Sequence, residues 1–524
     1  MSQYVKPNIN KLQSTIKHIV VLMLENRSFD NLLGWLYAGK TPPYGQQYEG
    51  LNESMWNPLN NIDADGNPFI EKVPVAKNGY PSTVYTKAHV AVPNPVDFTL
   101  PNPDPGEGFR DTNYQLFHKY KVAEAYTPAP VNTGFVDNYQ SAMLYGTYTF
   151  GDRPNDPRTI MKCYTPEQTP VLSELARSFA VCDQYYCSIP SQTLPNRDFV
   201  HAATSTGFVN NSPVANCNAY TVYNVIQDAI DAGRKDLSWG IFSDNLYDPK
   251  KKDDLEGKFG KDHFSLTRVI MTKLYDSRFD DNFGTIEDFK SKCQSGELPS
   301  YTFLEPNYGG PKQNDQHPPS DIRPGEQLIA DMYNAIRNSP AFEQTLFVIT
   351  YDEHGGCYDH FPPAGGAKNP DITNTAGQDG FNFTRFGVRV PCVVVNPYIM
   401  PGLIPRPDSK AYNYTPFDHT SIIKTVYQCF GLQGNLTERD KAAPDFSGLL
   451  TLDAPRKTDI PVVTPLQWNP TAVTGDVNEL HRLIGKVMGD LTGTEVPESA
   501  DLLEYIQQSY NSFFNTGTTS NKKA

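Results

Sequence analysis

Residues 18–24, His-Ile-Val-Val-Leu-Met-Leu, decide the fold, and the apolar run ends abruptly at Glu25-Asn26-Arg27. An apolar run rich in β-branched residues, without polar alternation, is typical of a strand buried on both faces of a sheet. The pattern recurs at Thr345–Tyr351, before Asp352-Glu353-His354, and at Val388–Val395. Helical periodicity separates these strands, so we predict an α/β fold with a mostly parallel central sheet flanked by helices. The predicted helices cover 170–179, 222–233, 324–338, 418–430 and 477–491.

Three segments differ from this alternating pattern. Residues 40–130 are dense in Pro, Asn, Asp and Tyr, so we expect a loop-rich insertion or small subdomain within a catalytic domain spanning 1–430. Residues 431–514 are expected to form a small C-terminal appendage, with short strand-like segments such as 460–464 and a final helix. The polar tail 515–524 is expected to be disordered.

Composition excludes several classes of protein. The 524-residue chain carries a formal net charge of −14, so nucleic acid is not an expected partner and would be repelled. The longest apolar run, Ile19–Leu24, is far shorter than the roughly 18 residues that cross a membrane. Residues 1–13 contain no apolar signal-peptide core, so we expect a cytoplasmic protein or one exported by a route without such a signal.

Acidic and amide side chains follow two of the buried strands. Glu25 and Asn26 follow the first strand, and Asp352 and Glu353 follow the second. Neighbouring parallel strands bring such groups to one edge of a sheet. Hard oxygen ligands suit one divalent cation, such as Mg²⁺, Ca²⁺, Mn²⁺ or Zn²⁺. The alternative is that each carboxylate caps a following helix, but two pairs at matching positions favour a metal site.

A turn with two prolines, SIPSQTLPNR at 188–197, offers a hydroxyl at Thr193. A hydroxyl held on a rigid turn beside a cation is a competent nucleophile toward phosphorus. Arg197 offers a planar fork for phosphate oxygens, and we expect Asn196 and Arg197 to contact the substrate. The alternative is a structural turn whose Arg lies in a buried ion pair.

Histidines are the third candidate group, because an ester's leaving oxygen needs a proton donor. His317 lies in a polar loop flanked by prolines, where an apolar core cannot account for it. His354, His360 and His419 also lie in polar segments. A structural role is the alternative for each of them.

Four stretches together resemble a known family. They are IKHIVVLMLENRSFDNLLG (16–34), NRDFVHAATSTG (196–207), NDQHPPSDIRPGE (314–326) and VITYDEHGGCYDH (348–360). In this order they resemble the phosphoesterase family of bacteria, fungi and plants that contains non-haemolytic phospholipases C and AcpA-type acid phosphatases. The resemblance runs from about residue 16 to about residue 430 and implies an alkaline-phosphatase-like core.

The resemblance also implies roles for individual residues. A single metal would be held at positions matching Glu25, Asn26, Thr193, Asp352 and Glu353. Thr193 would attack phosphorus and become a covalent phosphothreonine. His317 would act on the leaving group, and His354 would contact the phosphate or support the site from behind.

Position 107 departs from the family pattern. Many relatives carry a His in a Gly-His-Gly or Gly-His-Ser setting after an Asp-Pro, whereas this chain has Asp104-Pro105-Gly106-Glu107-Gly108. A carboxylate near a phosphate repels it unless it is protonated or bound to metal. Glu107 is therefore either a substrate contact of altered character or part of a second cation site.

We expect a phosphoric-ester hydrolase that acts as a phospholipase C on glycerophospholipids, making transient contact with a membrane surface. A phosphomonoesterase of the acid phosphatase type, acting on small phosphate esters, is the alternative within enzymes. A catalytically silent phospho-ligand binder is the alternative of another class. The absence of a G-x-S-x-G motif removes support for a carboxylic-ester hydrolase.

Overall fold

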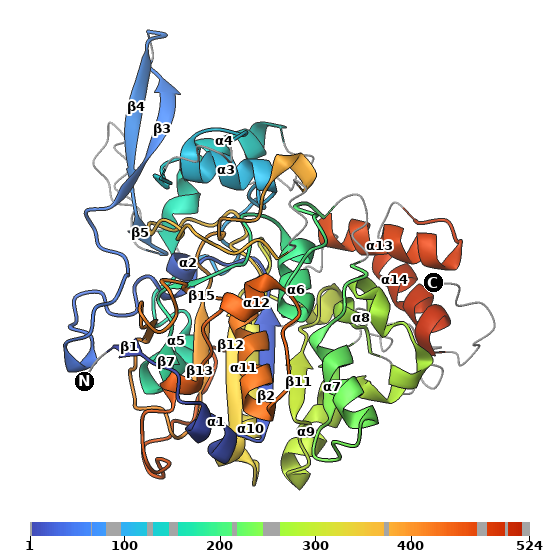
Figure 1. Cartoon of the computed structure of the whole chain (residues 1–524). Helices are drawn as coiled ribbons and strands as arrows, with labels where there is room; N and C mark the ends of the chain where they lie inside the picture. The colour runs from blue at the N-terminus through green and yellow to red at the C-terminus, as the bar shows by residue number, and fades with distance from the viewer. Residues whose placement is uncertain are drawn as a thin grey trace.

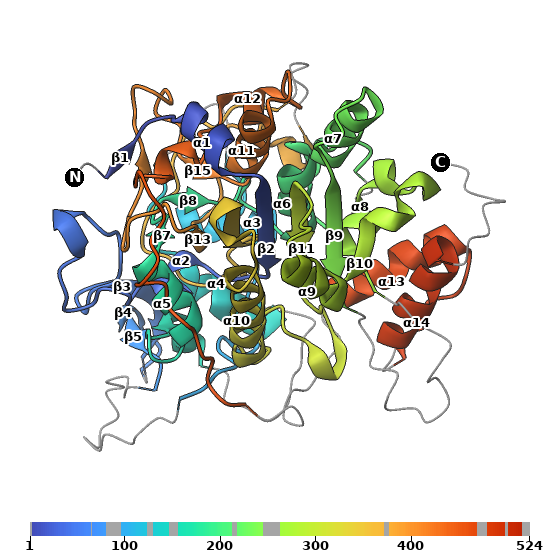
Figure 2. The same cartoon turned by 90° about the horizontal axis from the view of Figure 1, so that it is seen from below.

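The centre of the protein is a seven-stranded sheet with β2 (His18–Leu24) in the middle (Figures 1 and 2). The computed structural model describes residues 3–63, 65–79, 96–122, 129–145, 156–211, 217–244, 263–370, 377–468, 479–497 and 501–515. Both neighbours of β2 run parallel to it. The strand order is β10 (Phe283–Thr285), β9 (Trp239–Ser243), β11 (Tyr301–Leu304), β2, β12 (Thr345–Tyr351), β13 (Cys392–Val395) and β7 (Ala180–Val181).

The sheet is mostly parallel, as predicted, but the third apolar segment differs from its prediction in length and direction. Only Cys392–Val395 forms a strand, and it pairs antiparallel with β12. The preceding residues instead bond to the segment around β8 (Tyr185–Tyr186), where the Val390 N–H donates to the Tyr185 carbonyl at 3.1 Å. Apolar content predicts burial of a strand on both faces but carries no information about its direction.

Helices cover both faces of the sheet, as Figure 2 shows. This arrangement buries the apolar side chains on both sides of β2 and β12 and explains why these strands lack polar alternation. One layer contains α1 (Ile9–Thr15), α6 (Thr193–Ala202), α7 (Val222–Asp231) and α11 (Thr420–Phe430), and the other contains α5 (Pro170–Ser178), α9 (Ile286–Ser295) and α10 (Arg323–Arg337).

The insertion between residues 40 and 130 contains more regular structure than expected. A two-stranded antiparallel hairpin, β3 (Trp56–Ile62) and β4 (Pro68–Pro74), projects from the body in Figure 1. Helices α3 (Phe109–Phe117) and α4 (Phe135–Tyr145) lie beyond the carboxyl ends of the parallel strands. The Tyr- and Phe-rich stretch 80–150, which could supply an apolar mouth for acyl chains, falls partly outside the described residues, at 80–95, 123–128 and 146–150.

The C-terminal segment is helical where it is regular. Helices α13 (Glu479–Thr492) and α14 (Leu502–Tyr510) pack together beyond β10 (Figure 1). The strand expected at 460–464 is wrong: this segment lies along α10, and the Tyr333 hydroxyl donates to the Pro461 carbonyl at 2.8 Å. The expected disordered tail lies, from residue 516 onward, outside the described residues. Within the described chain, no helix combines the length and apolar character that crossing a membrane requires.

Candidate active site

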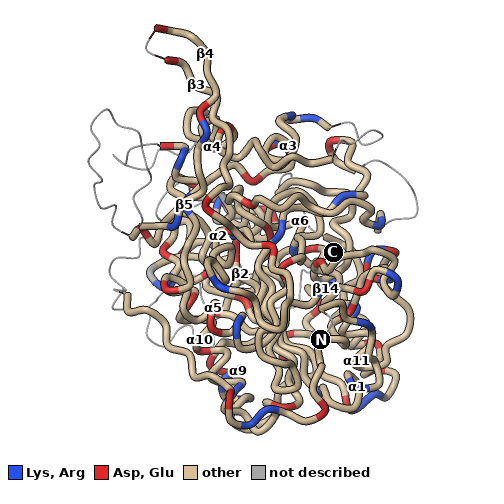
Figure 3. Tube along the Cα trace, turned by 90° about the vertical axis from the view of Figure 1, so that its left-hand side faces the viewer, with Lys and Arg blue, Asp and Glu red and all other residues tan. Residues whose placement is uncertain are grey.

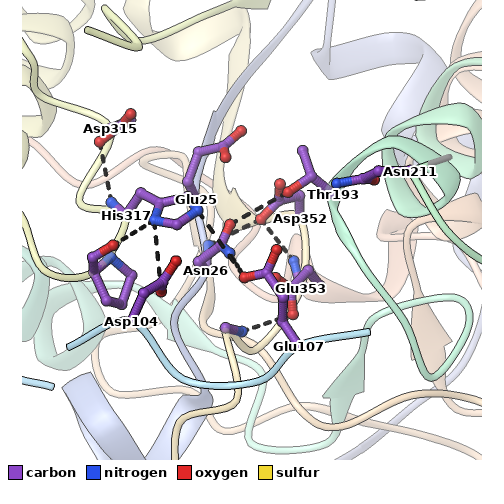
Figure 4. Close-up of polar contacts among 12 residues, drawn as sticks. Glu25, Asn26, Asp104, Glu107, Thr193, Asn211, Asp315, His317, Asp352 and Glu353 are labelled. Carbon is purple, nitrogen blue, oxygen red and sulfur yellow. Dashed lines mark hydrogen bonds and ion pairs between the residues drawn. The ribbon is translucent and has the colours of Figure 1, made fainter. Parts of the chain in front are cut away.

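The strand ends deliver their polar groups to one edge of the sheet (Figure 4). Directly after β2, Asn26 has a φ of 56°, a left-handed conformation that Asn tolerates better than most residues. Its N–H donates to Asp352 Oδ1 at 3.0 Å, and its Oδ1 lies 3.4 Å from the hydroxyl of Thr193. The turn at Asn26 therefore brings together the carboxyl ends of β2 and β12 and the N-terminus of α6.

Gly355 allows the loop after β12 to approach Asn26. Gly355 has a φ of +60°, and a Cβ at this position would lie 2.3 Å from the carbonyl oxygen of Asn26. Only glycine satisfies both the conformation and the contact. The Gly355 N–H also donates to Glu353 Oε2 at 2.6 Å, which fixes the orientation of that carboxylate.

Thr193 is the first residue of α6, where helix N–H groups favour an anion. The turn before it is held by the side chain of Asn196. The Asn196 Oδ1 accepts from the Ile189 N–H at 3.0 Å, and its Nδ2 donates to the carbonyls of Ile189, Ser191 and Gln192. Because both polar atoms of Asn196 bind the backbone, we infer a structural role for this residue, and the substrate contact expected for it stays a prediction.

Arg197 forms a buried ion pair through two of its three guanidinium nitrogens, and Nη1 donates to no residue that the structure describes. Its Nε and Nη2 donate to Glu25 Oε1 at 3.0 and 2.6 Å, and its Nε lies 3.4 Å from Asp352 Oδ2. All three side chains are fully buried. The guanidinium is therefore engaged with the carboxylates, because buried negative charge requires a counter-charge. This is the ion-pair alternative that the sequence left open.

The carboxylates form an electrostatically costly group. Burial raises the pKa of Glu25 and that of Glu353, and the charge of Asp352 raises each further. Burial also raises the pKa of Asp352, against the charge of Arg197. Arg197 alone does not compensate three buried carboxylates, so the site favours an additional cation.

The donor atoms fit a divalent cation in their chemistry. Glu25 Oε2, Asp352 Oδ2 and Glu353 Oε1 are buried and accept no hydrogen bond from any residue that the structure describes. With the amide oxygen of Asn26 and the hydroxyl of Thr193, they make a set of hard oxygen donors. Glu25, Asp352 and Glu353 do not, however, form a compact group. In the compact groups found among the described residues, one ligand atom from each of three side chains lies within 4.8 Å of the others.

A more compact group lies beside them and includes Glu107. One ligand atom each from Asp104, Glu107 and His317 lies within 4.8 Å of the others. Glu107 Oε2 accepts a hydrogen bond from the Asn26 amide, so this group adjoins the strand-end carboxylates (Figure 4). Glu107 thus lies at the site, next to Asn26 and 4.0 Å from His317 Nε2.

His317 presents one nitrogen toward the site. Its Nδ1 lies 2.6 Å from the Pro318 carbonyl oxygen, which assigns the proton of the neutral ring to Nδ1 and leaves Nε2 facing Glu107. Burial lowers the pKa of His317 to about 4. Asp315 holds the loop by accepting the His317 N–H at 3.0 Å.

His354 lies behind the site. Its Nε2 lies 2.7 Å from Gln115 Oε1 and its Nδ1 lies 3.2 Å from Glu353 Oε2. Burial lowers the pKa of His354 to about 3. Of the two roles left open for it, this position favours support of Glu353 over phosphate contact, and its expected catalytic role stays a prediction.

Three further residues support the site, and two of them, Asn211 and Gln115, have no signal in the sequence. Asn211 accepts from the Leu194 N–H at 2.9 Å, and Gln115 reaches His354 from α3. His419 Nε2 lies 2.6 Å from the Asp352 carbonyl oxygen. Only His419 was among the candidates, because isolated amides in polar segments are too common to be singled out.

A mostly parallel sheet that brings a hydroxyl at a helix N-terminus together with buried acidic oxygens fits a hydrolase that uses a metal ion and a hydroxyl nucleophile. The model of the phosphoesterase family matches residues 16–433, and the chain belongs to this family. The chain is similar to a protein of Arabidopsis thaliana named non-specific phospholipase C3, with 33% identity over 86% of this chain and 76% of the relative. It is also similar to Mycobacterium tuberculosis phospholipase C B, with 27% identity over 88% and 85% of the two chains.

A solved structure from Vibrio parahaemolyticus, of a protein in the alkaline phosphatase superfamily, aligns with 53% of this chain and 65% of its own. The identity is 11% and the TM-score is 0.27.

Proposed function

We propose that the protein is a phospholipase C that cleaves the phosphodiester of a glycerophospholipid on the glycerol side. The observation that carries this proposal is the Thr193 hydroxyl, placed at the N-terminus of α6 and 3.4 Å from the amide oxygen of Asn26. The names of the relatives, phospholipases C of a plant and a mycobacterium, support the substrate class.

One divalent cation would be held by oxygens of Glu25, Asn26, Thr193, Asp352 and Glu353. When bound, it would lower the pKa of the Thr193 hydroxyl and stabilise the negative charge that develops on the phosphate oxygens. Arg197 would offset part of the remaining carboxylate charge and fix the position of Glu25.

The chain's own residues account for the two steps. Thr193, having released its proton to solvent, forms the Oγ1–P bond as the P–O bond to the glycerol carbon breaks. Nε2 of His317, which carries no proton in the neutral ring, takes up a proton from solvent and passes it to the leaving oxygen, which departs as diacylglycerol. Water then attacks phosphorus, the P–Oγ1 bond breaks, and Nε2 of His317 receives a proton from that water. The phospho-headgroup leaves, Thr193 Oγ1 takes up a proton from solvent, and Nε2 of His317 returns its proton to solvent, which restores both residues.

Two alternatives remain from the sequence. An acid phosphatase would use the same nucleophile on a monoester, but Glu107 and Asp104 beside His317 would repel a dianionic phosphate more than a monoanionic diester. A silent phospho-ligand binder would not need a nucleophile.

The test is hydrolysis by the purified protein of phosphatidylcholine and of p-nitrophenyl phosphate, each with chelator and after metal add-back. We expect metal-dependent release of diacylglycerol. Turnover of the monoester alone would favour the phosphatase, and inactivity on both would overturn the proposal.

Thr193→Ala and Thr193→Ser separate an enzyme from a binder. The alanine variant should lose at least about a thousandfold in activity, as expected when a nucleophile is removed. The serine variant keeps the hydroxyl and should retain measurable turnover. Equal activity of the alanine variant and the wild type would exclude Thr193 as the nucleophile.

A further inference from the structure

The hairpin of β3 and β4 has one mostly apolar face, on which the side chain of Asn60 donates a hydrogen bond to Asp137 of the body. In its register Ile62 lies opposite Pro68 and Asn60 lies opposite Ile70. Side chains alternate between the two faces of a strand, and directly opposed residues share a face. We call this face the outer face. Its residues are Trp56, Pro58, Asn60, Ile62, Pro68, Ile70, Lys72 and Pro74.

The two faces of the hairpin differ sharply in burial. On the inner face, Asn57, Leu59 and Val73 are buried against the body. On the outer face, Ile62 and Ile70 are 68% and 66% exposed and Trp56 is 42% exposed. Phe69, on the inner face near the tip, is 44% exposed, so the inner face is buried only close to the body, whereas the exposed large apolar side chains of the outer face extend from Trp56 to Ile62. Large apolar side chains that share an exposed face mark an interaction surface.

The hairpin is anchored to the body. Asp137 of α4 accepts a hydrogen bond from the Asn60 N–H at 2.7 Å. Arg158 forms a two-point ion pair with Glu71, with N–O distances of 2.8 and 2.7 Å. Because these contacts hold the hairpin in place, binding of a partner to the outer face does not require the loss of conformational entropy that ordering a flexible loop would cause.

Charge on the outer face suits a lipid surface. Lys72 is its one charged residue, and the Lys72 Nζ lies 4.5 Å from the centre of the Trp56 ring. Acidic residues lie at the tip of the hairpin (Figure 3), namely Asp63 and Asp65 in the turn. Glu71 lies on the inner face and pairs with Arg158. Trp beside Lys is an arrangement favoured at the interface between lipid and water, where the ring meets the headgroups and the ammonium meets phosphate.

We propose that the outer face of this hairpin binds the surface of a zwitterionic phospholipid bilayer and brings the active site to its substrate. The inference rests on the proposed function, since a phospholipase must meet its lipid in a membrane. The hairpin projects beyond the end of the sheet at which β2 and β12 finish, and the site lies at this same end (Figure 1). The net charge of −14 disfavours strongly anionic membranes, which leaves apolar contact as the main attraction.

The test uses the full chain with Ile62→Ser and Ile70→Ser combined, and vesicles of phosphatidylcholine. Cosedimentation should show vesicle binding about tenfold weaker than for the wild type, because two exposed apolar side chains no longer enter the interface. Vesicle hydrolysis should fall in parallel. Hydrolysis of a short-chain phosphatidylcholine, kept below its critical micelle concentration, should be unchanged. The matched control is Val462→Ser, which alters a side chain that is 69% exposed in the segment along α10.

The outcomes separate this inference from the proposed function. Vesicle binding that is equal for the double variant and the wild type overturns the inference. A change of oligomeric state without a change in vesicle binding also overturns it and assigns the face to a second copy of the chain. Loss of vesicle binding in the variant supports the inference even if the wild type hydrolyses neither lipid, in which case the proposed function alone fails.

Discussion

Three polar residues in the first turns of α6 have different structural and chemical roles. Thr193 presents its hydroxyl to the site, whereas Asn196, three residues later, uses its whole amide to hold the preceding turn. Arg197 neutralises Glu25 and Asp352. All three are buried, so the difference lies in which atoms remain available for a ligand.

Asn196→Ala tests the structural role directly. Removal of a buried amide that makes four backbone hydrogen bonds should lower the free energy of unfolding by about 2–4 kcal/mol. The measurement is chemical denaturation, with the exposed Asn435→Ala as control. Unchanged stability combined with a raised KM would instead restore the substrate contact expected from the sequence.

At the scale of elements, the loop after β12 is constrained by its contact with the end of β2. Gly355→Ala would place a methyl group against the Asn26 carbonyl at a φ that disfavours side chains. We expect a strain of about 1–3 kcal/mol and a loss of activity, since Asn26 adjoins Thr193. Thermal unfolding and turnover measure the two effects. Gly365→Ala, where a Cβ meets nothing within 4 Å, is the control and should behave as the wild type.

The junction of α10 and α5 contains a buried acid. Glu326 Oε2 accepts from the Val171 N–H at 2.7 Å, and burial raises the pKa of Glu326 to about 8. The folded protein therefore keeps this proton while the unfolded chain loses it above the ordinary pKa of Glu. The stabilisation is complete at pH values below that ordinary pKa and is lost as the pH rises toward about 8.

Glu326→Gln should remove this pH dependence. Between pH 5 and pH 7.5 the unfolding free energy of the variant should rise relative to the wild type by about 1.4 kcal/mol per pH unit. Denaturation across this range measures the difference. Parallel curves for the two proteins would show that Glu326 is ionised in the fold.

At the scale of the whole molecule, three buried carboxylates with one Arg lower the stability of the folded protein. A bound cation should raise that stability, because it offsets their charge. Chelation should lower the melting temperature, and a divalent cation at about 100 times its Kd should add about 2.7 kcal/mol of stability. Calorimetry with Mg²⁺, Ca²⁺, Mn²⁺ and Zn²⁺ added in turn would identify the ion. Glu353→Gln should reduce the shift, and no shift with any of the four ions would contradict the assigned donors.

The α/β class, the two central strands and the position of polar groups at their ends could all be predicted from the sequence, because apolar runs and the residues that follow them are local features. The direction of β13, the hairpin of β3 and β4, and the helical C-terminal pair required the structure. Pairing direction and packing depend on contacts between distant segments.

The sequence by itself determined the family, the strand-end carboxylates and amide, and the hydroxyl at Thr193. Only the tertiary structure decided which polar atoms remain available at the site. It committed Asn196 to the backbone, Arg197 to Glu25 and His354 to Gln115, and it placed Glu107 against Asn26. The physical reason is burial: away from water each donor and acceptor requires a partner, and the partner comes from whichever segment the fold brings within reach.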